Sequence, residues 1–216
     1  LNTSLLLKEG MSISEVAALT AEQREEKIKN EISRQLDTDD ALNALKMAMV
    51  TYDEALFERT SRNYRSHHGF EALVEQLYLP LLNMIGLLWQ ASSICPAQEH
   101  FTSNLVRQKL ISAIDALPPG GDDTRPVVVL YLPENEIHEL GLLYLHYRLR
   151  REGRRSIYLG ESVPIKDLVD LARQWEGPLD ICSILTLLPR HDDIYSYMAR
   201  LVGQLPDTDF RIHLCG

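Results

Sequence analysis

The first half of the chain places hydrophobic residues at helical spacing, which predicts a bundle of amphipathic helices. This period runs through about residues 42–64, with an interruption near Thr51. The stretch 70–90 is predicted to be the longest helix, because its leucines share one broad face. The stretch 96–116 follows a short connection and begins with a proline, which suits the first position of a helix.

Polar residues indicate where these helices begin and end. Ser12 or Ser14 can cap a short N-terminal helix, and Thr20–Gln23 has the spacing of a capping box. Thr51–Glu54 is a second candidate of the same kind. The segment 67–69, two histidines and a glycine, is predicted to be a loop.

The second half of the chain alternates apolar strands with helices. A linker at 118–125, with two Pro, two Gly and two Asp, precedes it. The alternation favours an open, doubly wound parallel sheet, whose ligands bind at the carboxyl ends of the strands. Strands are predicted near 127–132, 156–159, 180–186 and 210–214, and helices near 137–152, 165–175 and 193–204.

These patterns predict the fold class α plus α/β, in which a four-helix-type bundle precedes a flavodoxin- or Rossmann-like doubly wound parallel sheet. We expect a helical cap domain at 20–117, the linker at 118–125 and the α/β domain at 126–216. Residues 1–19 form two short amphipathic pieces around a turn. Because the chain starts with Leu and stops just after an apparent strand, we expect a fragment that is truncated at its C-terminus.

Composition narrows the class of protein. Apolar residues make up 45% and charged residues 25% of the 216 residues, which is typical of a folded soluble protein. The net charge of −9 argues against a segment that itself wraps nucleic acid, because such contacts need clustered cations. The arginines within 148–155 form a compact basic cluster, which we interpret as the solvated end of a helix.

Membrane and redox signals point to the cytoplasm. No apolar run is expected to reach the length that a membrane span needs and no basic-apolar signal segment opens the chain, so we expect no membrane partner. Cys95, Cys182 and Cys215 are an odd number without metal-site spacing, and we interpret them as reduced, mostly buried thiols of a cytosolic protein.

His138 is the candidate metal ligand, because it lies on the loop after the first predicted strand. Glu136 can hydrogen-bond the far ring nitrogen, which would fix the tautomer and improve the imidazole as a metal donor. In the alternative interpretation, Glu134 and Glu136 only favour a helix N-terminus. Gly141 costs helix stability, which makes sense if something must approach the helix closely there.

Two further groups are candidates for binding. Ser183, Leu185 and Thr186 are placed near the carboxyl end of the third strand, where a small hydroxyl could line a deep slot; a serine there can also simply bond nearby backbone. The second group is Trp89 with 99–100, a Glu-His pair, at the same end of two antiparallel helices. The alternative is a tryptophan in the bundle core and a solvated pair at a helix start.

Together these motifs resemble a known family, the cobalamin-binding domain, and within it the CarH/LitR type of MerR-family transcriptional repressor. The resemblance rests on Glu136-x-His138-x-x-Gly141, on Ser183-x-Leu185, and on a terminal Gly216 where a paired glycine motif would begin. It also rests on Trp89 followed by Glu99-His100 and on Tyr158-Leu159-Gly160 before Pro164. A further match is the sequence His-Tyr-Arg-Leu-Arg-Arg at 146–151, in the first predicted helix of the α/β domain. Residues 1–19 resemble the last helices of a MerR-type winged helix-turn-helix.

The resemblance implies a cofactor and partners. Cobalamin, most simply adenosylcobalamin, would bind with His138 as the lower axial ligand of cobalt. Trp89, Glu99 and His100 would shelter the upper adenosyl group, while the Ser-x-Leu strand, with the glycine pair, would line the slot for the displaced tail. Cofactor state would control a homo-oligomer, dimer or tetramer, and hence its grip on operator DNA through an N-terminal domain mostly missing from this chain. The protein would be a repressor and photoreceptor, not an enzyme.

One position departs from the light-sensing members of the family. A histidine that captures cobalt after photolysis follows their tryptophan, whereas this chain has Gln90. An amide is a poor substitute for imidazole, so we predict a reduced or absent response to light. Two alternatives stay open: a corrinoid protein of a methyl-transfer system, and a regulator of the same fold that has lost cobalamin binding.

Overall fold

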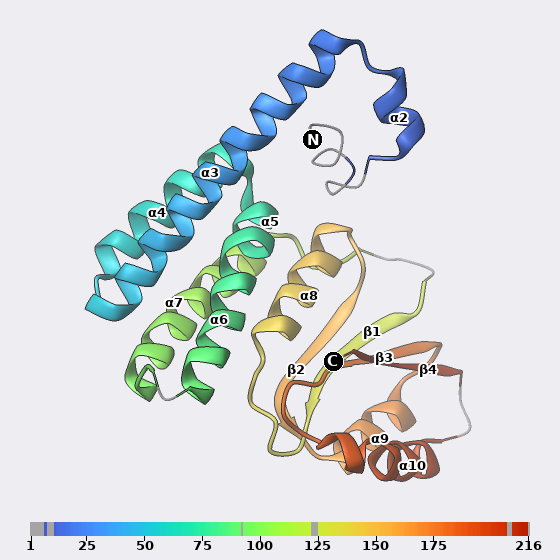
Figure 1. Cartoon of the computed structure of the whole chain (residues 1–216). Helices are drawn as coiled ribbons and strands as arrows, with labels where there is room; N and C mark the ends of the chain where they lie inside the picture. Colours follow the sequence, from blue (N-terminus) through green and yellow to red (C-terminus); the bar gives the residue numbers. More distant parts are fainter. Residues whose placement is uncertain (1–6, 8–10, 92, 122–124, 207–208, 216) are drawn as a thin grey trace. The chain divides into compact units, whose positions relative to one another are not determined.

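The computed structural model describes residues 7, 11–91, 93–121, 125–206 and 209–215, with only the backbone at 29, 31–36 and 191 (Figure 1). Contacts divide the chain into two compact units, Leu1–Thr102 and Ser103–Gly216. The division falls inside a helix, on the N-terminal side of the linker expected at 118–125. Gly216 and most of the segment 1–10 lie outside the described residues. The predicted domain limits stay a prediction, because a division by contacts does not test independent folding.

The first unit is built from helices joined by short turns. Its described elements are α2 (Ile13–Ala18), α3 (Ala21–Thr51), α4 (Glu54–His68), α5 (Phe70–Ala72), the π-helix η1 (Leu73–Tyr78), α6 (Leu79–Gln90) and the start of α7 (Pro96–Asp115).

Two of the predicted helix starts are confirmed. Ser12 accepts a hydrogen bond from the backbone N–H of Glu15, and the Glu15 carboxylate accepts from the backbone of Ser12, which completes a capping box for α2. Thr20 and Gln23 make the same reciprocal pair at the start of α3. These caps satisfy N–H groups that the first turn of a helix leaves without partners.

The turn between α3 and α4 differs from the prediction. Asp53, not Thr51, caps α4 by accepting from the N–H of Leu56 at 2.8 Å, while the Thr51 hydroxyl donates to a carbonyl of its own helix. α3 is also the longest helix, with 31 residues. The histidines at 67–68 end α4 instead of forming a loop; the break is at Gly69, whose φ of 88° is easy only for glycine.

Residues 70–90 are helical throughout but include a π-helical segment that the sequence pattern did not reveal. The N–H of Leu79 donates to the carbonyl of Val74, five residues earlier. Pro80 lies immediately after it, and a proline inside a helix has no N–H and crowds the carbonyl four residues before it. One extra residue in the turn accommodates that ring.

The same stretch is apolar and long enough to pass a membrane-span test by length and composition, contrary to the expectation from sequence. A core helix passes the same test, and the residues of 70–90 that are buried in the described structure are Phe70, Leu73, Val74, Leu77, Tyr78, Leu81 and Ile85.

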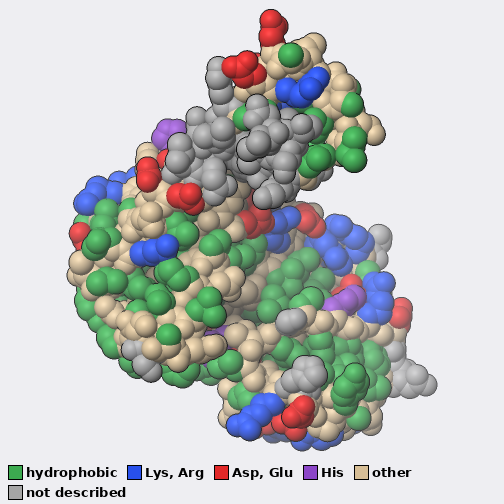
Figure 2. Space-filling view, viewed as in Figure 1, with side chains coloured by type: hydrophobic (Ala, Val, Ile, Leu, Met, Phe, Trp, Pro, Cys, Tyr) green, Lys and Arg blue, Asp and Glu red, His purple; other side chains and the backbone are tan. Residues whose placement is uncertain are grey.

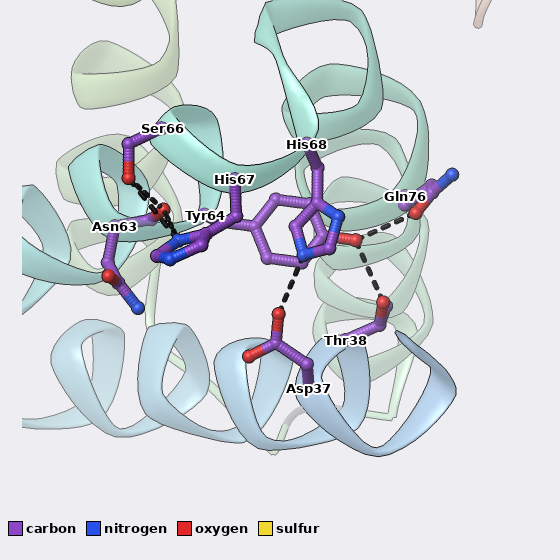
Figure 3. A network of polar contacts seen from close by, with 8 residues as sticks. All are labelled: Asp37, Thr38, Asn63, Tyr64, Ser66, His67, His68 and Gln76. Atoms are coloured by element: carbon purple, nitrogen blue, oxygen red, sulfur yellow. Dashed lines mark hydrogen bonds and ion pairs between the residues drawn. The ribbon is translucent and has the colours of Figure 1, made fainter. Parts of the chain in front are cut away.

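A polar network links α3, α4 and η1 (Figure 3). The buried hydroxyl of Tyr64 lies 2.8 Å from the Thr38 hydroxyl and donates to the Gln76 side chain at 2.7 Å. Beside it, the His68 ring is 2.7 Å from the Asp37 carboxylate. Because each of these contacts joins two different elements, the network holds three helical segments in register.

The second unit contains a four-stranded parallel sheet in the order β2-β1-β3-β4. Three helices follow strands, and a single 3-10 turn, η2, precedes the last of them. The described elements are β1 (Val127–Pro133), α8 (Leu140–Arg151), β2 (Ser156–Val163), α9 (Ile165–Gln174), β3 (Leu179–Ile184), η2 (His191–Asp193), α10 (Ile194–Gln204) and β4 (Phe210–Cys215).

Helices cover both faces of this sheet (Figure 1). Val129 of the central strand packs in one core with Leu168 of α9 and Leu201 of α10. Its neighbour Leu130 points to the opposite face and packs with Leu142 of α8. Every residue of β1 is buried, as expected for a strand covered on both sides. The predicted doubly wound parallel sheet after a helical region is therefore confirmed.

Candidate functional site

The loop after β1 carries His138, whose side chain is 46% exposed. The strand ends at Pro133 and α8 begins at Leu140, not at 137 as predicted. β1 lies between β2 and β3, so the direction in which the sheet is built reverses at β1. In sheets of this kind, the crevice at the carboxyl ends beside this switch point is where ligands bind.

A single buried carboxylate organises this loop. Glu136 is 1% exposed, and its Oε1 accepts from the N–H groups of Ile137 at 2.9 Å and His138 at 3.0 Å. The same oxygen lies 2.5 Å from Nδ1 of His138. Its Oε2 accepts from the N–H groups of Leu187 and Leu188, both at 2.7 Å, on the loop after β3. Glu136 thus ties the two loops at the switch point together.

The charge state of this carboxylate sets the tautomer of the imidazole. Burial raises the pKa of Glu136, but the N–H donors of His138, Leu187 and Leu188 and the His138 ring lower it further, to about 2. An ionised carboxylate can only accept, so Nδ1 of His138 must carry the proton. In a neutral imidazole ring with this proton on Nδ1, Nε2 keeps its lone pair, which is the form that ligates metals. Because α8 starts four residues later, the alternative role for Glu136 in a first helical turn is wrong.

A second buried carboxylate follows directly, and the sequence analysis did not single it out. Glu139 is 7% exposed; its Oε1 accepts from Nε of Arg107 at 2.5 Å and its Oε2 from the Tyr158 hydroxyl at 2.6 Å. Burial and this carboxylate both raise the pKa of Tyr158. Within the second unit, Glu139 therefore fastens the end of the His138 loop to α7 and β2.

The predicted tail-binding residues lie partly beyond the third strand. β3 ends at Ile184, so Leu185 and Thr186 belong to the following loop, which corrects their predicted place. Leu185 is half-buried and donates its N–H to the carbonyl of Cys215, whereas Thr186 is exposed. Ser183 is 1% exposed, and its hydroxyl has no hydrogen-bond partner within the described residues. The alternative in which it bonds nearby backbone is therefore not supported.

Gly141 is the second residue of α8. A Cβ at this position would lie 3.5 Å from Cγ2 of Ile184, an ordinary van der Waals distance. The helix thus lies against β3 here, and the structure itself imposes no strict need for glycine.

In the first unit, Trp89 lies in the last turn of α6 and is 57% exposed, so the alternative of a core tryptophan is wrong. Glu99 and His100 lie in the first turns of α7, with the His100 Nδ1 at 2.6 Å from a Glu99 oxygen. Exposed hydrophobic side chains occur at several places on the visible surface (Figure 2). That Trp89 converges on the pair stays a prediction.

The same end of the first unit holds a cluster that the sequence did not reveal. Tyr52 has a φ of 54°, and its hydroxyl lies 3.4 Å from the thiol of Cys95, whose pKa it lowers. Cys95 and Cys215 are exposed and Cys182 is half-buried, so the prediction of mostly buried thiols is wrong. The Tyr52 ring packs edge-on against Phe101 with 5.5 Å between ring centroids. Gln98 donates to the carbonyl of Val50. These contacts join the end of α3 to the start of α7 across more than forty residues, a separation that leaves no local pattern.

Comparison with known proteins identifies relatives. Residues 41–112 match the family model of the B12 binding domain. The chain is 40% identical over 94 residues to the HTH-type transcriptional repressor CarH of Myxococcus xanthus, covering 44% of this chain and 30% of CarH. It is 30% identical over 169 residues to the repressor CarA of the same organism, covering 74% of this chain and 51% of CarA.

A solved structure shares the fold. The monomethylamine corrinoid protein of Methanosarcina barkeri superposes with a TM-score of 0.65 at 14% identity, covering 82% of this chain and 84% of that protein. At this identity the likeness concerns the fold alone. The chain spans about half or less of the length of the curated relatives. Residues 41–112 are thus similar to the B12 binding domain, and the chain is similar to parts of two HTH-type transcriptional repressors.

Proposed function

We propose that this chain is the cobalamin-binding sensor region of a transcriptional regulator, with His138 as the lower axial ligand of cobalt. The observation that carries the proposal is the imidazole of His138, held by Glu136 in the tautomer that leaves Nε2 as a donor. The similarity to CarH and CarA supports a regulator over other users of the same cofactor.

The chemistry of the donor set fits a metal that brings its own ligands. Within the described residues, no three His, Cys, Asp or Glu side chains come together as a metal-ion site. A free divalent ion needs several protein ligands, usually four for zinc. A corrin ring already supplies four nitrogens, so one protein imidazole is enough.

The remaining predicted residues take roles around this bond. The buried, unpaired hydroxyl of Ser183 can bond a polar group of the cofactor's tail, with Gly141, Leu185 and Thr186 beside the same crevice. Trp89, exposed at the end of α6, and the paired Glu99 and His100 would cover an upper adenosyl group. This form of the cofactor, adenosylcobalamin, supplies a cobalt–carbon bond that light can break.

The rest of the proposal concerns the whole protein. Cofactor state would set the size of a homo-oligomer, dimer or tetramer, and thereby the binding of operator DNA by an N-terminal domain of the MerR type. We place this regulator in the cytoplasm and assign it no catalytic activity. Gln90 replaces the histidine that would take cobalt after illumination, so we expect a weak light response or none.

Binding of cobalamin with and without His138 tests the proposal. The chain is incubated in darkness with adenosylcobalamin and with hydroxocobalamin, and the absorption spectrum of the protein fraction is recorded after gel filtration. The spectrum should change on binding in the unmodified chain and in His67→Ala, an exposed histidine on α4, whereas His138→Ala should bind at least about tenfold more weakly. Equal binding by both variants would contradict the proposal.

The alternatives have their own outcomes in that experiment. A corrinoid carrier would pass a methyl group from methylcobalamin to a thiol acceptor, and the shared fold alone does not favour it. A regulator that has lost cobalamin would leave both spectra unchanged in every variant.

A further inference from the structure

Arg107, on α7, reaches the His138 loop at the residue next to the proposed cobalt ligand. Its Nε donates to Oε1 of Glu139 at 2.5 Å, and Glu139 follows His138 directly in the chain. The Glu139 side chain is only 9% exposed, whereas that of Arg107 is 48% exposed. A buried carboxylate needs paired donors, because leaving its charge unpaired in a buried place is costly. The bond to Arg107 therefore fixes this end of the loop to α7.

The second oxygen of Glu139 is held from β2. The Tyr158 hydroxyl donates to Oε2 at 2.6 Å. Gly160 lies against this pair: its φ is 82°, which side chains rarely adopt, and a Cβ there would lie 3.4 Å from the Tyr158 ring and 3.9 Å from Oε2. Although Glu139 occupies the cap position of α8, its side chain makes no cap hydrogen bond. The carboxylate thus serves the contacts with α7 and β2 and not the start of its own helix.

Arg107 lies on the same side of α7 as His100. Seven residues are close to two helical turns, so the two positions are about 10 Å apart along the axis and about 20° apart around it. Both side chains are largely accessible, with 70% of His100 and 48% of Arg107 exposed, whereas Thr102, Leu105 and Val106 on the other side of α7 are buried. A rotation or shift of α7 therefore moves His100 and Arg107 together.

The contact between Arg107 and Glu139 is a link that pH does not switch. The bond to Glu139 raises the pKa of Arg107, and the charge of Glu161, an exposed residue of β2, adds to that effect. Water screens an exposed charge, so Glu161 does not replace the bond to Glu139. A guanidinium keeps its charge at every working pH, so only movement of α7 or of the loop breaks the pair.

We propose that Arg107 is a positioning residue through which α7 couples the upper ligand of the cofactor to the bond between cobalt and His138. This inference rests on the proposed function, in which His100 covers the upper ligand and His138 binds cobalt. Loss of the upper ligand frees His100, α7 shifts, and Arg107 carries Glu139 and the adjacent His138 with it. Coupling between two sites is reciprocal, so weakening the His138 bond also weakens the grip on the upper ligand.

Binding of adenosylcobalamin in darkness by His100→Ala, Arg107→Gln and the double variant tests this coupling. Each single substitution should weaken binding about tenfold. Residues this far apart usually contribute independently, so unlinked losses would multiply to about 100-fold; we expect the double variant to lose about tenfold less than that product. Arg173→Gln, which removes an exposed arginine of α9, is the charge-matched control and should change binding in neither background.

Two readouts separate positioning from a purely structural role. Hydroxocobalamin has a small upper ligand, so His100→Ala should leave its binding unchanged, whereas Arg107→Gln should still weaken it about tenfold. In the cofactor-free chain, the imidazole NMR signals of His138, assigned with His138→Ala, should shift in Arg107→Gln but not in Arg173→Gln. Arg107→Lys keeps the positive charge and should restore part of the affinity. If Arg107→Gln does not fold, Arg107→Met combined with Glu139→Gln leaves no unpaired charge and takes its place.

The outcomes distinguish this inference from the proposed function. Losses that multiply fully, or equal binding by Arg107→Gln and Arg173→Gln, would overturn the coupling and leave the proposed function intact. Equal binding by His138→Ala and the unmodified chain, or no binding by the unmodified chain, would instead contradict the proposed function, and the coupling would fall with it.

Discussion

The two ends of the proposed cofactor site are built differently. The His138 loop is fixed by a buried carboxylate with five donor contacts, two of them from another loop. Trp89 is more than half exposed, and the side chain of His100 is 70% exposed. A metal ligand must be in place before the metal arrives, whereas a cover can be completed by the ligand it covers. Under the proposed function, the His138 side would be a rigid anchor and the Trp89 side would be the part that senses.

The largest effect is expected at the anchor. Glu136→Gln keeps the shape of the side chain but turns one oxygen into a donor, which faces either the Leu187 and Leu188 amides or His138. Unpaired buried donors cost about 1–3 kcal/mol each, so the free energy of unfolding should fall by roughly 2–4 kcal/mol. Cobalamin affinity should fall about 10- to 100-fold. Urea unfolding and equilibrium binding measure both; an unchanged stability would mean that the carboxylate does not organise the loop.

The pKa of the buried Glu136 carboxylate also predicts how the free energy of unfolding depends on pH. Because the folded-state pKa of Glu136 is about 2, below the ordinary 4.5, its contribution is complete above pH 4.5 and is lost as the pH falls toward 2. The shift corresponds to about 3 kcal/mol. The difference in unfolding free energy between the unmodified chain and Glu136→Gln should therefore shrink steadily from pH 4.5 downward. A constant difference over this window would exclude the carboxylate as its source.

Trp89, which would cover the upper ligand, should affect cofactor affinity but not the stability of the fold. Trp89→Ala removes an exposed side chain, so the free energy of unfolding should change by less than about 0.5 kcal/mol. Affinity for adenosylcobalamin should fall about tenfold, while hydroxocobalamin, with its small upper ligand, should bind as before. Titrations with the two cofactors provide the comparison. Equal losses for both would place Trp89 away from the upper ligand.

A substitution in the first unit that touches neither the His138 loop nor Trp89 should change the stability of the fold without changing cobalamin affinity. Tyr64→Phe deletes the hydroxyl that contacts Thr38 and Gln76 (Figure 3). The expected loss of stability is about 1 kcal/mol, without a change in cobalamin affinity. Should affinity fall as well, the packing of α3 against α4 and η1 would have to be counted as part of the site.

The smallest effect is expected from light. With Gln90 beside Trp89, illumination of the adenosylcobalamin complex should leave the oligomer mass nearly unchanged, because an amide is a weak ligand for cobalt. Gln90→His should increase the change, measured by light scattering before and after green light. A full light-driven dissociation of the unmodified chain would show that this position is not decisive.

Some of this arrangement could be predicted from the sequence because its signals are local. The apolar run of β1 followed by a helical period placed His138 at the carboxyl edge of the sheet, and Thr20–Gln23 marked a helix start three residues apart. Glu136 could be paired with His138 for the same reason, since only two residues separate them.

The partners of Glu136 and Glu139 could not be predicted from the sequence, because they are distant along the chain or are backbone groups that carry no sequence signal. Leu187 and Leu188 contribute backbone N–H groups, which nearly every residue has, from fifty residues away. Arg107 and Tyr158 reach Glu139 only once the sheet has formed. The cap of α4 was predicted at Thr51 but is Asp53, because the left-handed turn at Tyr52 determines which side chain faces α4.

The bond between His138 and cobalt is tested most directly by electron paramagnetic resonance of the cob(II)alamin complex, formed with protein in which histidine alone is labelled with ¹⁵N. An axial histidine nitrogen then splits each cobalt line into a doublet, and the account predicts this doublet in the unmodified chain and in His67→Ala and its loss in His138→Ala. A triplet from the unlabelled base of the cofactor itself, or a doublet that survives in His138→Ala, would contradict it.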